Sequence, residues 1–543
     1  MVTRLVPIAF AVVAAYGFLV MHLYSVQVRQ GSYYSSRASS QVNASGVLFP
    51  ARGSIFFTDK NGNRVPVAMN KEYPVVYAVP KTIDDAQEVS ARLAPILHID
   101  ADDLLKKISR PDSYRLLTKR ATDDMVRNVK DLHIEGIYTD TAPARYYPMS
   151  TVASHLLGFV GYSNEHTSEQ GKYGLEEEYN SILQGRDGVS ESGKLIPAAS
   201  GNDITISIDP SIQIEAERIL QQLVDQYDAE SGTVIVQEPS TGKLLAMGSV
   251  PHFDPNTYGQ STLSSLLNPA ISQIYEPGSV FKVITMAAGI DSGSITADTT
   301  FLDTGVLALD GYTIRNWDKQ AHGTVTMTNV IEQSLNTGAA FAQRKTGNGL
   351  FKQYLTRFGF GEKTEVDLPG ELKGDMRRLF SKDAVSVEFA TASFGQGVAV
   401  TPLQMINSFS AIANGGQLMR PYLNVDMNPK IVRRVISPET ASIISTMMVS
   451  AVDKAKVAQI PGYRLAGKTG TAFIPDFKRG GYTDQVINTY VGFGPVAHPR
   501  FTILFKLVKP SGAPLAGQTV VPAFRSLAEF LINYYNIPPD RID

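Results

Sequence analysis

The 543-residue sequence contains no cysteine, which excludes disulfide bonds, cysteine metal sites and thiol catalysis and suits an enzyme outside the cytoplasm. His155 and His166 have no partners at the spacing of metal ligands, so we predict no metal and no cofactor. The formal net charge is only -2, and nothing in the charge balance indicates a nucleic-acid partner. A hydrophobic share of 43% is ordinary for a globular protein of several domains.

One long run lacks charged side chains. From Leu5 to Val28 there is no Asp, Glu, Lys or Arg, and Arg4 and Arg29 bracket roughly 24 residues, enough to span a bilayer. The alternative is a cleaved signal peptide, but the run exceeds the usual apolar core of about 7 to 15 residues and no small-x-small site follows. We predict that residues 1–29 form a short cytoplasmic N-terminus and one uncleaved anchor in the cell (inner or cytoplasmic) membrane, with the remainder extracytoplasmic.

Residues 30–204 mix short strands and helices without a catalytic constellation. The stretch Gly53–Met69 alternates around Asn61-Gly62, which is typical of a tight hairpin. Helical spacing occurs over Asp84–Leu97 and Thr122–Leu132. We interpret this region as a spacer or docking module.

A second domain is predicted over residues 205–543. It opens with a helix pattern over Pro210–Tyr227 that Asp209 can cap, is mostly helical from about 265 to 450, and closes with an amphipathic helix over Val521–Tyr535. Strand patterns occupy Thr233–Glu238, Lys243–Val250, Tyr463–Ile474, Val486–Phe493 and Phe501–Val508. Early and late strands should share one antiparallel sheet with the helices inserted between them, an α+β fold.

The first candidate for chemistry is Ser279. Pro277 and Gly278 interrupt the chain, and the apolar run Val280–Ala288 then predicts a buried helix with Ser279 in its first turn. Residues three apart share a helix face, so the Lys282 amine can reach the Ser279 hydroxyl. Lysine, with an ordinary pKa of about 10.4, can act as a base only if burial, the helix dipole or a second cation lowers that pKa.

Two further motifs can complete such a site. Ser334-Leu-Asn336 lies at the end of a helical run, Thr328–Leu335, where a hydroxyl can relay a proton and an amide can hold a carbonyl. Lys468-Thr469-Gly470-Thr471 lies in a strand pattern, where Lys468 and Gly470 point to one side and the glycine lets a substrate lie close to an edge. Lys468 is also the candidate second cation.

Each motif has a second copy that a structural role explains. Ser240-Thr-Gly-Lys243 lies in a turn between two strand patterns, which predicts a hairpin. Lys345-Thr-Gly347 ends a helix pattern over Thr337–Arg344, where Gly347 can serve as the C-cap. Ser200-Gly-Asn202 shows that Ser-x-Asn alone is common. Specificity therefore comes from the three motifs taken together.

In this order the three motifs resemble those of the penicillin-binding proteins and serine β-lactamases. Neighbouring sequence is similar to class B penicillin-binding proteins over nearly the whole chain: Tyr275-Glu-Pro-Gly-Ser279, Phe394-Gly-Gln-Gly-Val-Ala-Val-Thr-Pro-Leu-Gln404, Arg52-Gly-Ser-Ile55 and Asp59-Lys-Asn-Gly62. The Lys-Thr-Gly-Thr form favours the division-type (septal) branch. Elongation-type and sporulation-type roles remain alternatives.

The resemblance implies a fold and an activity. The fold is a single transmembrane helix, an elongated mixed α/β pedestal or dimerisation-type module over 30–204, and a transpeptidase domain. That domain has a five-stranded antiparallel sheet flanked by helices and a mostly helical inserted subdomain. The activity is that of a peptidoglycan D,D-transpeptidase, which cross-links stem pentapeptides ending in D-Ala-D-Ala to an acceptor amine and is acylated by β-lactams.

The resemblance also implies residue roles. Ser279 would attack the carbonyl between the two D-alanines, Lys282 would be the general base, and Ser334 with Lys468 would pass the proton to the leaving amine. Asn336 would hold the stem peptide. Lys468 and the run Thr469-Gly470-Thr471 would bind the terminal carboxylate, and the backbone amides of Ser279 and Thr471 would form the oxyanion hole.

Three departures and absences refine these expectations. Leu335 replaces the aspartate of class A β-lactamases, and the Glu176-Glu-Glu-Tyr-Asn180 run precedes Ser279 instead of following Asn336, so we interpret it as a solvated helix. A membrane-bound β-lactamase or β-lactam sensor is the alternative function. No glycosyltransferase pattern precedes residue 205, so a polymerising partner is expected, by resemblance a polytopic SEDS-type glycan polymerase together with division proteins.

Overall fold

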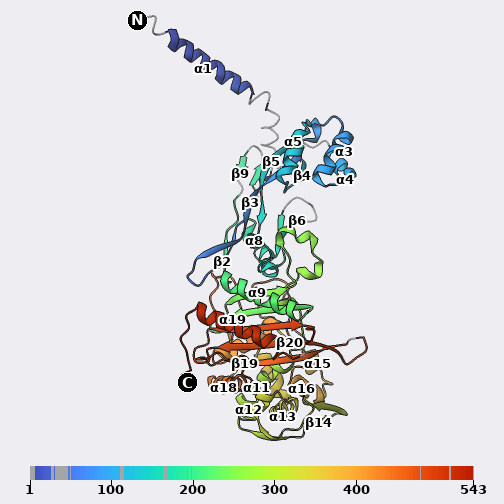
Figure 1. Cartoon of the computed structure of the whole chain (residues 1–543), viewed down its shortest axis with the longest axis vertical. Coiled ribbons are helices and arrows are strands. Elements are labelled where there is room, and N and C mark those ends of the chain that lie inside the picture. Colours follow the sequence, from blue (N-terminus) through green and yellow to red (C-terminus); the bar gives the residue numbers. More distant parts are fainter. Residues whose placement is uncertain are drawn as a thin grey trace. The chain divides into compact units, whose positions relative to one another are not determined.

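The computed structural model describes residues 6–25, 30, 47–48, 51–110, 115–162, 169–186, 188–191, 194–196, 199–476, 478–512 and 515–541. The chain divides into two compact units (Figure 1). The first comprises Met1–Ser54, Ala68–Tyr146 and Ser181–Asp203, and the second comprises Ile55–Val67, Tyr147–Asn180 and Ile204–Asp543.

Helix α1 covers Val6–Tyr24 near the start of the chain. Among the residues that the structure describes, no helix is both long enough and apolar enough to cross a bilayer. The predicted anchor over Leu5–Val28 is therefore not confirmed, and Leu5 and residues 26–28 lie outside the described part.

The body of the first unit is a small sheet covered by helices. The second part of β3 (Arg64–Ala78) pairs antiparallel with β4 (Arg115–Thr118) and β5 (Ile137–Tyr146). The helices are α3 (Ala86–Leu97), α4 (Ala101–Ile108) and α5 (Asp123–Asp131). The Asp85 carboxylate and the Thr122 hydroxyl cap α3 and α5 by accepting backbone N–H bonds, which confirms both helix predictions.

The predicted hairpin at Asn61-Gly62 is present. It joins β2 (Ile55–Thr58) to the start of β3, and the Asp59 carboxylate accepts the N–H groups of Asn61 and Asn63 at 2.8 Å each. Gly62 adopts a φ of 85°, a conformation that glycine takes without steric cost.

The second unit contains the five-stranded antiparallel sheet that the sequence predicts. Its strands are β11 (Ser231–Gln237), β12 (Leu244–Val250), β19 (Ala466–Pro475), β20 (Tyr482–Gly494) and β21 (Phe501–Val508), in the order β12-β11-β21-β20-β19. Strand β19 begins three residues later than predicted, because the N–H of Tyr463 closes a turn onto the carbonyl of Ile460. It is an edge strand, and it carries the Lys468 motif.

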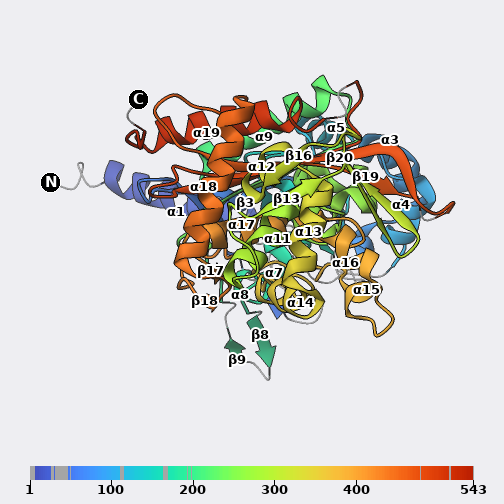
Figure 2. The ribbon, with the colours of Figure 1, turned by 90° about the horizontal axis from the view of Figure 1, so that it is seen from below.

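Helices cover both faces of this sheet. Helices α9 (Pro210–Gln226) and α19 (Val520–Tyr534) pack on one face, where an apolar core includes Phe505 and Phe524 (Figure 1). Helix α17 (Pro402–Ala413) packs against β11, β20 and β21 from the other face, and α11 (Lys282–Asp291) lies on that side (Figure 2).

The region between β12 and β19 is mostly helical, as predicted. Its other main helices are α12 (Met327–Gln333), α13 (Asn336–Thr346), α14 (Asn348–Arg357), α16 (Ser386–Ala392) and α18 (Pro438–Ala455). Three two-stranded ribbons in it were not predicted, because strands of three or four residues are too short to show a period. They are β13 (Thr300–Asp303) with β16 (Gly323–Thr326), β14 (Val306–Leu309) with β15 (Tyr312–Arg315), and β17 (Gln417–Met419) with β18 (Ile431–Arg434).

Further short α-helices and strands lie in the described part. They are β1 (Val47–Leu48), α6 (Ser154–Leu157), β6 (Phe159–Tyr162), β7 (Glu169–Lys172), α7 (Gly174–Glu178), α8 (Asn180–Leu183), β8 (Gly188–Glu191), β9 (Lys194–Ile196), β10 (Ile204–Ile206), α10 (Pro269–Ser272) and α15 (Arg377–Phe380). The solvated helix predicted over the Glu176-Glu-Glu-Tyr-Asn180 run is confirmed in part. Glu177 and Glu178 are exposed in α7, but Glu176 is fully buried and accepts a bond from the Tyr147 hydroxyl at 3.1 Å. Buried His155 contacts the carbonyl of Ser265, and burial lowers its pKa to about 4; His166 lies outside the described residues.

Candidate active site

Ser279 lies in a tight turn and not in a continuous α-helix. Residues Gly278–Phe281 form a 3-10 helix, and α11 begins directly after it at Lys282. In a 3-10 helix residues three apart eclipse one another, so Ser279 and Lys282 project from the same side of the chain. Gly278 has a φ of 61°, and its backbone conformation sets the direction of the turn.

The Lys282 amine is completely buried and its bonds go to Ser334. Lys282 Nζ lies 2.5 Å from the Ser334 carbonyl oxygen and 3.3 Å from Ser334 Oγ. Among the described residues no hydrogen bond reaches the Ser279 hydroxyl, so the direct bond that the spacing suggested is not formed. A neutral amine has two N–H groups and one lone pair, and two bonds donated to Ser334 leave the lone pair for the Ser279 proton.

Ser334 is held in an unusual backbone conformation. Helix α12 ends at Gln333, and Ser334 adopts φ 58° and ψ 46°, a left-handed conformation that costs a residue other than glycine roughly 1 kcal/mol. This conformation brings both its carbonyl and its hydroxyl to the Lys282 amine. Sequence reasoning placed Ser334 within the helix, whereas the structure places it at the helix cap.

Lys468 approaches Ser334 from the edge strand. Lys468 Nζ lies 3.0 Å from Ser334 Oγ, 3.1 Å from the Thr469 carbonyl oxygen and 3.3 Å from Thr469 Oγ1. The Ser334 hydroxyl therefore lies between two buried lysines, one from α11 and one from β19.

The two lysines are electrostatically unequal. Burial lowers the pKa of Lys282 well below its ordinary value, and the positive charge of Lys468 lowers it further. Burial alone lowers the pKa of Lys468, to about 7. The Lys282 amine therefore loses its proton more readily than Lys468, and Lys468 lies where a second cation would favour that loss.

Gly470 has a packing role that the sequence did not predict. A Cβ atom at Gly470 would lie 2.7 Å from the carbonyl oxygen of Pro277 and 3.1 Å from Val280 Cγ1. The glycine thus lets the turn of Ser279 pack directly against β19. On the same strand, Thr471 Oγ1 accepts the N–H of Ala516 at 3.1 Å, which leaves its hydroxyl proton free for another acceptor.

Asn336 is fixed at the start of α13. Its side-chain Nδ2 donates to the carbonyl of Arg315 at 2.9 Å, and the next residue, Thr337, donates to Asp303 Oδ1 at 2.8 Å. The ring nitrogen of Trp317 donates to the carbonyl of Gln333 at 3.1 Å. These bonds fasten the ends of β13 and β15 to the segment that carries Ser334 and Asn336.

Sequence reasoning missed the support of the Ser279 turn. Glu276 Oε1 accepts the N–H of Gly397 at 2.9 Å, and Glu276 Oε2 accepts the hydroxyl of Tyr482 at 3.0 Å. A Cβ atom at Gly395 would lie 2.3 Å from the carbonyl oxygen of Gly278. The Phe394-Gly-Gln-Gly run carries a sequence signal for this support, because two glycines around one residue allow such a close backbone approach.

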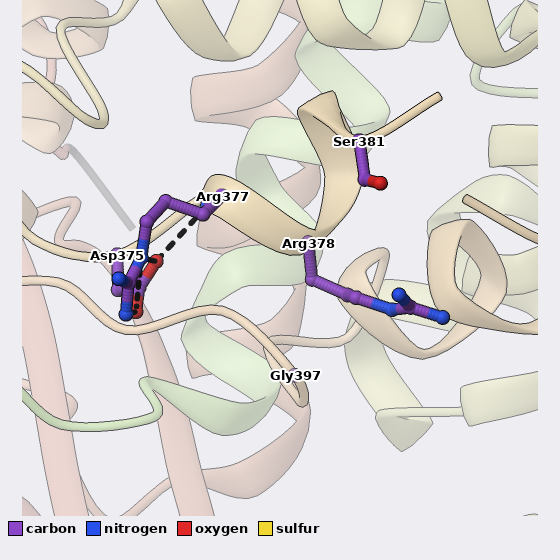
Figure 3. A pocket seen from close by; sticks show the side chains of 5 residues that line it. All are labelled: Asp375, Arg377, Arg378, Ser381 and Gly397. Atoms are coloured by element: carbon purple, nitrogen blue, oxygen red, sulfur yellow. Dashed lines mark hydrogen bonds and ion pairs between the residues drawn. The ribbon is translucent and has the colours of Figure 1, made fainter. Parts of the chain in front are cut away.

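Gly397 also borders a hollow of about 370 Å³ (Figure 3). The other lining residues are Asp375, Arg377, Arg378 and Ser381. Arg377 Nη2 donates to Asp375 Oδ2 at 2.6 Å, while Arg378 extends away from that pair in the picture. None of the predicted site residues lines this hollow.

The duplicate motifs have the predicted structural roles. Exposed Ser240 lies in the turn between β11 and β12, which is closed by the bond from Gly242 N–H to the carbonyl of Glu238. Lys345 lies in the last turn of α13, and Gly347 is the C-cap with a φ of 82°.

The comparisons agree with this geometry. The model described as "Penicillin binding protein transpeptidase domain" matches residues 232–529, and the model of the penicillin-binding protein dimerisation domain matches residues 48–204. The chain belongs to the class B penicillin-binding proteins. Ser279, Ser334 and Lys468 all lie within the transpeptidase match.

Relatives of this class B penicillin-binding protein cover most of its length. It is 32% identical to stage V sporulation protein D of Bacillus subtilis, over 91% of this chain and 80% of the relative. It is 30% identical to peptidoglycan D,D-transpeptidase FtsI of Escherichia coli, over 95% and 88%. The crystal structure of penicillin-binding protein 3 from Mycobacterium tuberculosis, complexed with aztreonam, superposes with a TM-score of 0.71 at 26% identity, over 91% of this chain and 98% of that one.

Proposed function

We propose that this class B penicillin-binding protein is a peptidoglycan D,D-transpeptidase in which Ser279 is the nucleophile. The observation that supports the proposal is the Ser334 hydroxyl, which lies 3.3 Å from Lys282 Nζ and 3.0 Å from Lys468 Nζ beside the turn of Ser279. The activity is the one named for the FtsI relative.

In the acylation step Lys282 removes the proton of Ser279. The serine oxygen attacks the carbonyl between the two terminal D-alanines of a stem pentapeptide and forms a tetrahedral intermediate. The backbone N–H groups of Ser279 and Thr471 hold the oxyanion, an interaction whose loss typically costs about 3 kcal/mol. The intermediate collapses, the peptide bond breaks, and the leaving amine takes its proton from Lys282 through Ser334, with Lys468 as the neighbouring acid.

The second step reverses these roles. The amine of a neighbouring stem peptide attacks the acyl-enzyme and loses a proton through the same two lysines. A new peptide bond then joins the two stem peptides, and the Ser279 hydroxyl is restored.

The remaining predicted residues hold the substrate. Asn336 binds the stem peptide, and Lys468 with the hydroxyls of Thr469 and Thr471 binds the terminal carboxylate, or that of a β-lactam. Gly470 serves them by letting β19 lie against the nucleophile turn.

Labelling with a fluorescent penicillin tests the nucleophile. We expect the parent protein to form a stable labelled band and Ser279→Ala to form none. Ser240→Ala is the matched control, because it alters the other Ser-x-x-Lys motif, and it should label like the parent. Labelling of Ser279→Ala at the parent level would refute the assignment.

The lifetime of the label separates transpeptidase from β-lactamase. A transpeptidase retains the penicilloyl group, whereas a hydrolase of the same motifs releases it. Loss of the label within seconds would favour the membrane-bound β-lactamase. Stable labelling without cross-linking activity would favour a β-lactam sensor.

The proposed organisation is the one expected from the sequence. Residues 1–29 form a cytoplasmic N-terminus and a single-pass anchor, residues 30–204 a pedestal, and residues 205–543 the transpeptidase domain outside the membrane. A chain that starts near Arg29 should then be soluble without detergent and still take up penicillin. A persistent need for detergent would argue for another membrane contact.

The proposed cellular role is septal cell-wall synthesis beside a SEDS-type glycan polymerase and division proteins. Its support is the Lys-Thr-Gly-Thr form of the third motif and the similarity to FtsI; the similarity to stage V sporulation protein D supports the sporulation alternative. Depletion followed by microscopy discriminates among the roles. Filaments would indicate division, rounded cells elongation, and defective spores with normal growth sporulation.

A further inference from the structure

A third buried lysine lies on the sheet face that carries the site. Lys506 is in β21, the central strand, and only 2% of its surface is exposed. Its Nζ donates one long hydrogen bond of 3.4 Å to Gln273 Oε1 and lies 5.0 Å from the centre of the Tyr275 ring. Within the described part of the chain Lys506 forms no ion pair, and the proposed reaction gives it no role.

Packing alone does not account for an amine at this position. Burial lowers the pKa of Lys506 only to about 8, so the side chain is mostly charged at neutral pH. A buried charge without a counterion is costly, whereas a methionine of similar shape would fill the same space without that cost.

The position of Lys506 in the sheet connects it to the nucleophile. Cross-strand partners in an antiparallel sheet project to the same face. Lys506 is opposite Thr233 on one side and Thr489 on the other, and Thr489 is opposite Gly470 on the edge strand. One row of the sheet therefore runs from β11 through Lys506 to Gly470.

The segment that leads to Ser279 lies along this row. Its first part, Gln273 and Tyr275, contacts Lys506. Its second part, Pro277 and Val280, contacts Gly470, where a Cβ atom would lie within 3.1 Å of each. Lys506 thus supports the start of the segment as Gly470 supports its end.

Tyr275 transmits the contact to the backbone. Its N–H and carbonyl both pair with Val400 at 3.0 Å, and four residues later the chain reaches Ser279. A cation under the ring and a backbone bridge at the same residue fix the beginning of the nucleophile turn, while Glu276 fixes its middle through Gly397 and Tyr482.

We propose that Lys506 is a positioning residue for acylation. Its amine acts through Tyr275 and Gln273 to hold Ser279 in position beside the Lys282 amine. This rests on the proposed role of Ser279. The contact is with residues of the nucleophile segment and not with substrate, so it affects the acylation step more than binding.

The test is Lys506→Met in the full chain, with penicillin acylation measured over a range of concentrations. We expect the acylation rate constant to fall about tenfold, the size that one desolvated cation–π contact can supply. The noncovalent dissociation constant should change less than about twofold, because that contact acts on the step and not on binding. The melting temperature at pH 7 should stay level or rise, because a buried charge is removed. An unchanged rate constant, or a rate constant and melting temperature that fall together, would overturn the proposal.

A double-mutant cycle tests the route through the ring. Tyr275→Leu removes the ring, and in that background Lys506→Met should lower the acylation rate constant much less than it does in the parent, because only the contact with Gln273 is left to lose. Independent effects of the two substitutions would overturn the route through Tyr275. The effect of Lys506→Met is measured between two proteins that both carry Tyr275→Leu, so the comparison holds even if Tyr275→Leu is itself less stable.

Two controls separate this proposal from the assignment of the nucleophile. Lys509→Met removes a lysine near the end of the same strand whose partner is the surface residue Glu230, and it should acylate like the parent. Ser279→Ala should abolish labelling with or without Lys506→Met. If Ser279→Ala still labels, the proposed function fails. If Ser279→Ala does not label but Lys506→Met acylates at the parent rate, the proposed function stands and the positioning role fails.

Discussion

One face of the five-stranded sheet packs against α9 and α19 with apolar side chains, whereas the opposite face holds buried amines. The contrast is sharpest between neighbours in β21. Phe505 is fully buried on the first face and Lys506 is 2% exposed on the second. On the second face Lys468 lies in the edge strand, and Lys282 packs above it in α11.

The two faces divide stability from chemistry. Full burial of a phenylalanine side chain contributes roughly 1.5 to 3 kcal/mol, and the apolar face contains several. Buried amines lower the stability of the protein because water no longer solvates their charge. The same loss of solvation lowers the pKa of Lys282 and makes it a base. The apolar face offsets the cost of the reactive one.

The largest expected effect comes from removing the base. Lys282→Met replaces a buried amine with an apolar side chain of similar length, and we expect penicillin acylation to slow by about a thousandfold, within the range for loss of a general base. Because the amine is costly to bury, thermal stability should not decrease. Labelling reactions stopped at successive times measure the acylation rate, and melting curves measure the thermal stability.

The matched control for this variant is Lys345→Met. Lys345 belongs to the duplicate Lys-Thr-Gly motif and is exposed at the end of α13. It should leave acylation unchanged and alter stability by less than about 0.5 kcal/mol. Parent-like acylation of Lys282→Met would show that another group accepts the proton.

A substitution on the apolar face should have the opposite signature. Phe524 in α19 is fully buried, its ring centre lies 4.7 Å from that of Tyr490, and a Cβ atom at Gly492 would lie 2.8 Å from its ring. Phe524→Ala should lower the free energy of unfolding by about 3 to 5 kcal/mol. The acylation rate constant of the folded molecules should remain that of the parent, and denaturant titration with active-site counting measures both.

This distinction can fail in one informative way. If Phe524→Ala slows acylation as strongly as it destabilises the protein, the two faces are mechanically coupled through the strands. The division between stability and chemistry would then be wrong.

Gly470→Ala is expected to act on both properties, with smaller effects. The added Cβ atom would meet the carbonyl of Pro277 at 2.7 Å, so the Ser279 turn must move away from β19. We expect a loss of about 1 to 3 kcal/mol of stability, as for other overpacked sites. We also expect an acylation rate about tenfold lower, since misplaced reacting groups lose proximity. A variant with parent-like acylation would show that the turn does not depend on that contact.

The sequence was sufficient for the sheet and for the three motifs. Period-two patterns place the strands to within a few residues, and β21 agrees at both ends. The features that the sequence did not predict depend on contacts between distant residues. The left-handed Ser334, the bonds of Glu276 and the close approach at Gly470 all depend on segments more than 50 residues apart in sequence or on local backbone strain. Burial of Glu176 was missed because three glutamates in a row suggest a solvated face.

The last prediction concerns pH and follows from Lys468. Its pKa is lowered to about 7 in the folded protein from an ordinary value of 10.5. Between these values the unfolded chain holds a proton that the folded protein has lost, so stability gains from rising pH in this window. The slope is at most about 1.4 kcal/mol per pH unit for one group. Lys468→Met removes this contribution, and melting temperatures measured from pH 7 to 10 should rise less steeply in the variant than in the parent.

Phe524→Ala provides the reference for that measurement. Neither phenylalanine nor alanine titrates, so the melting temperature of this variant should lie below that of the parent by a nearly constant amount at every pH. The two difference curves, one sloping and one flat, would distinguish the reactive face from the apolar face by thermodynamics alone. If the difference between parent and Lys468→Met were also constant, the Lys468 amine would titrate alike in the folded and unfolded chains, and burial would not be the source of its reactivity.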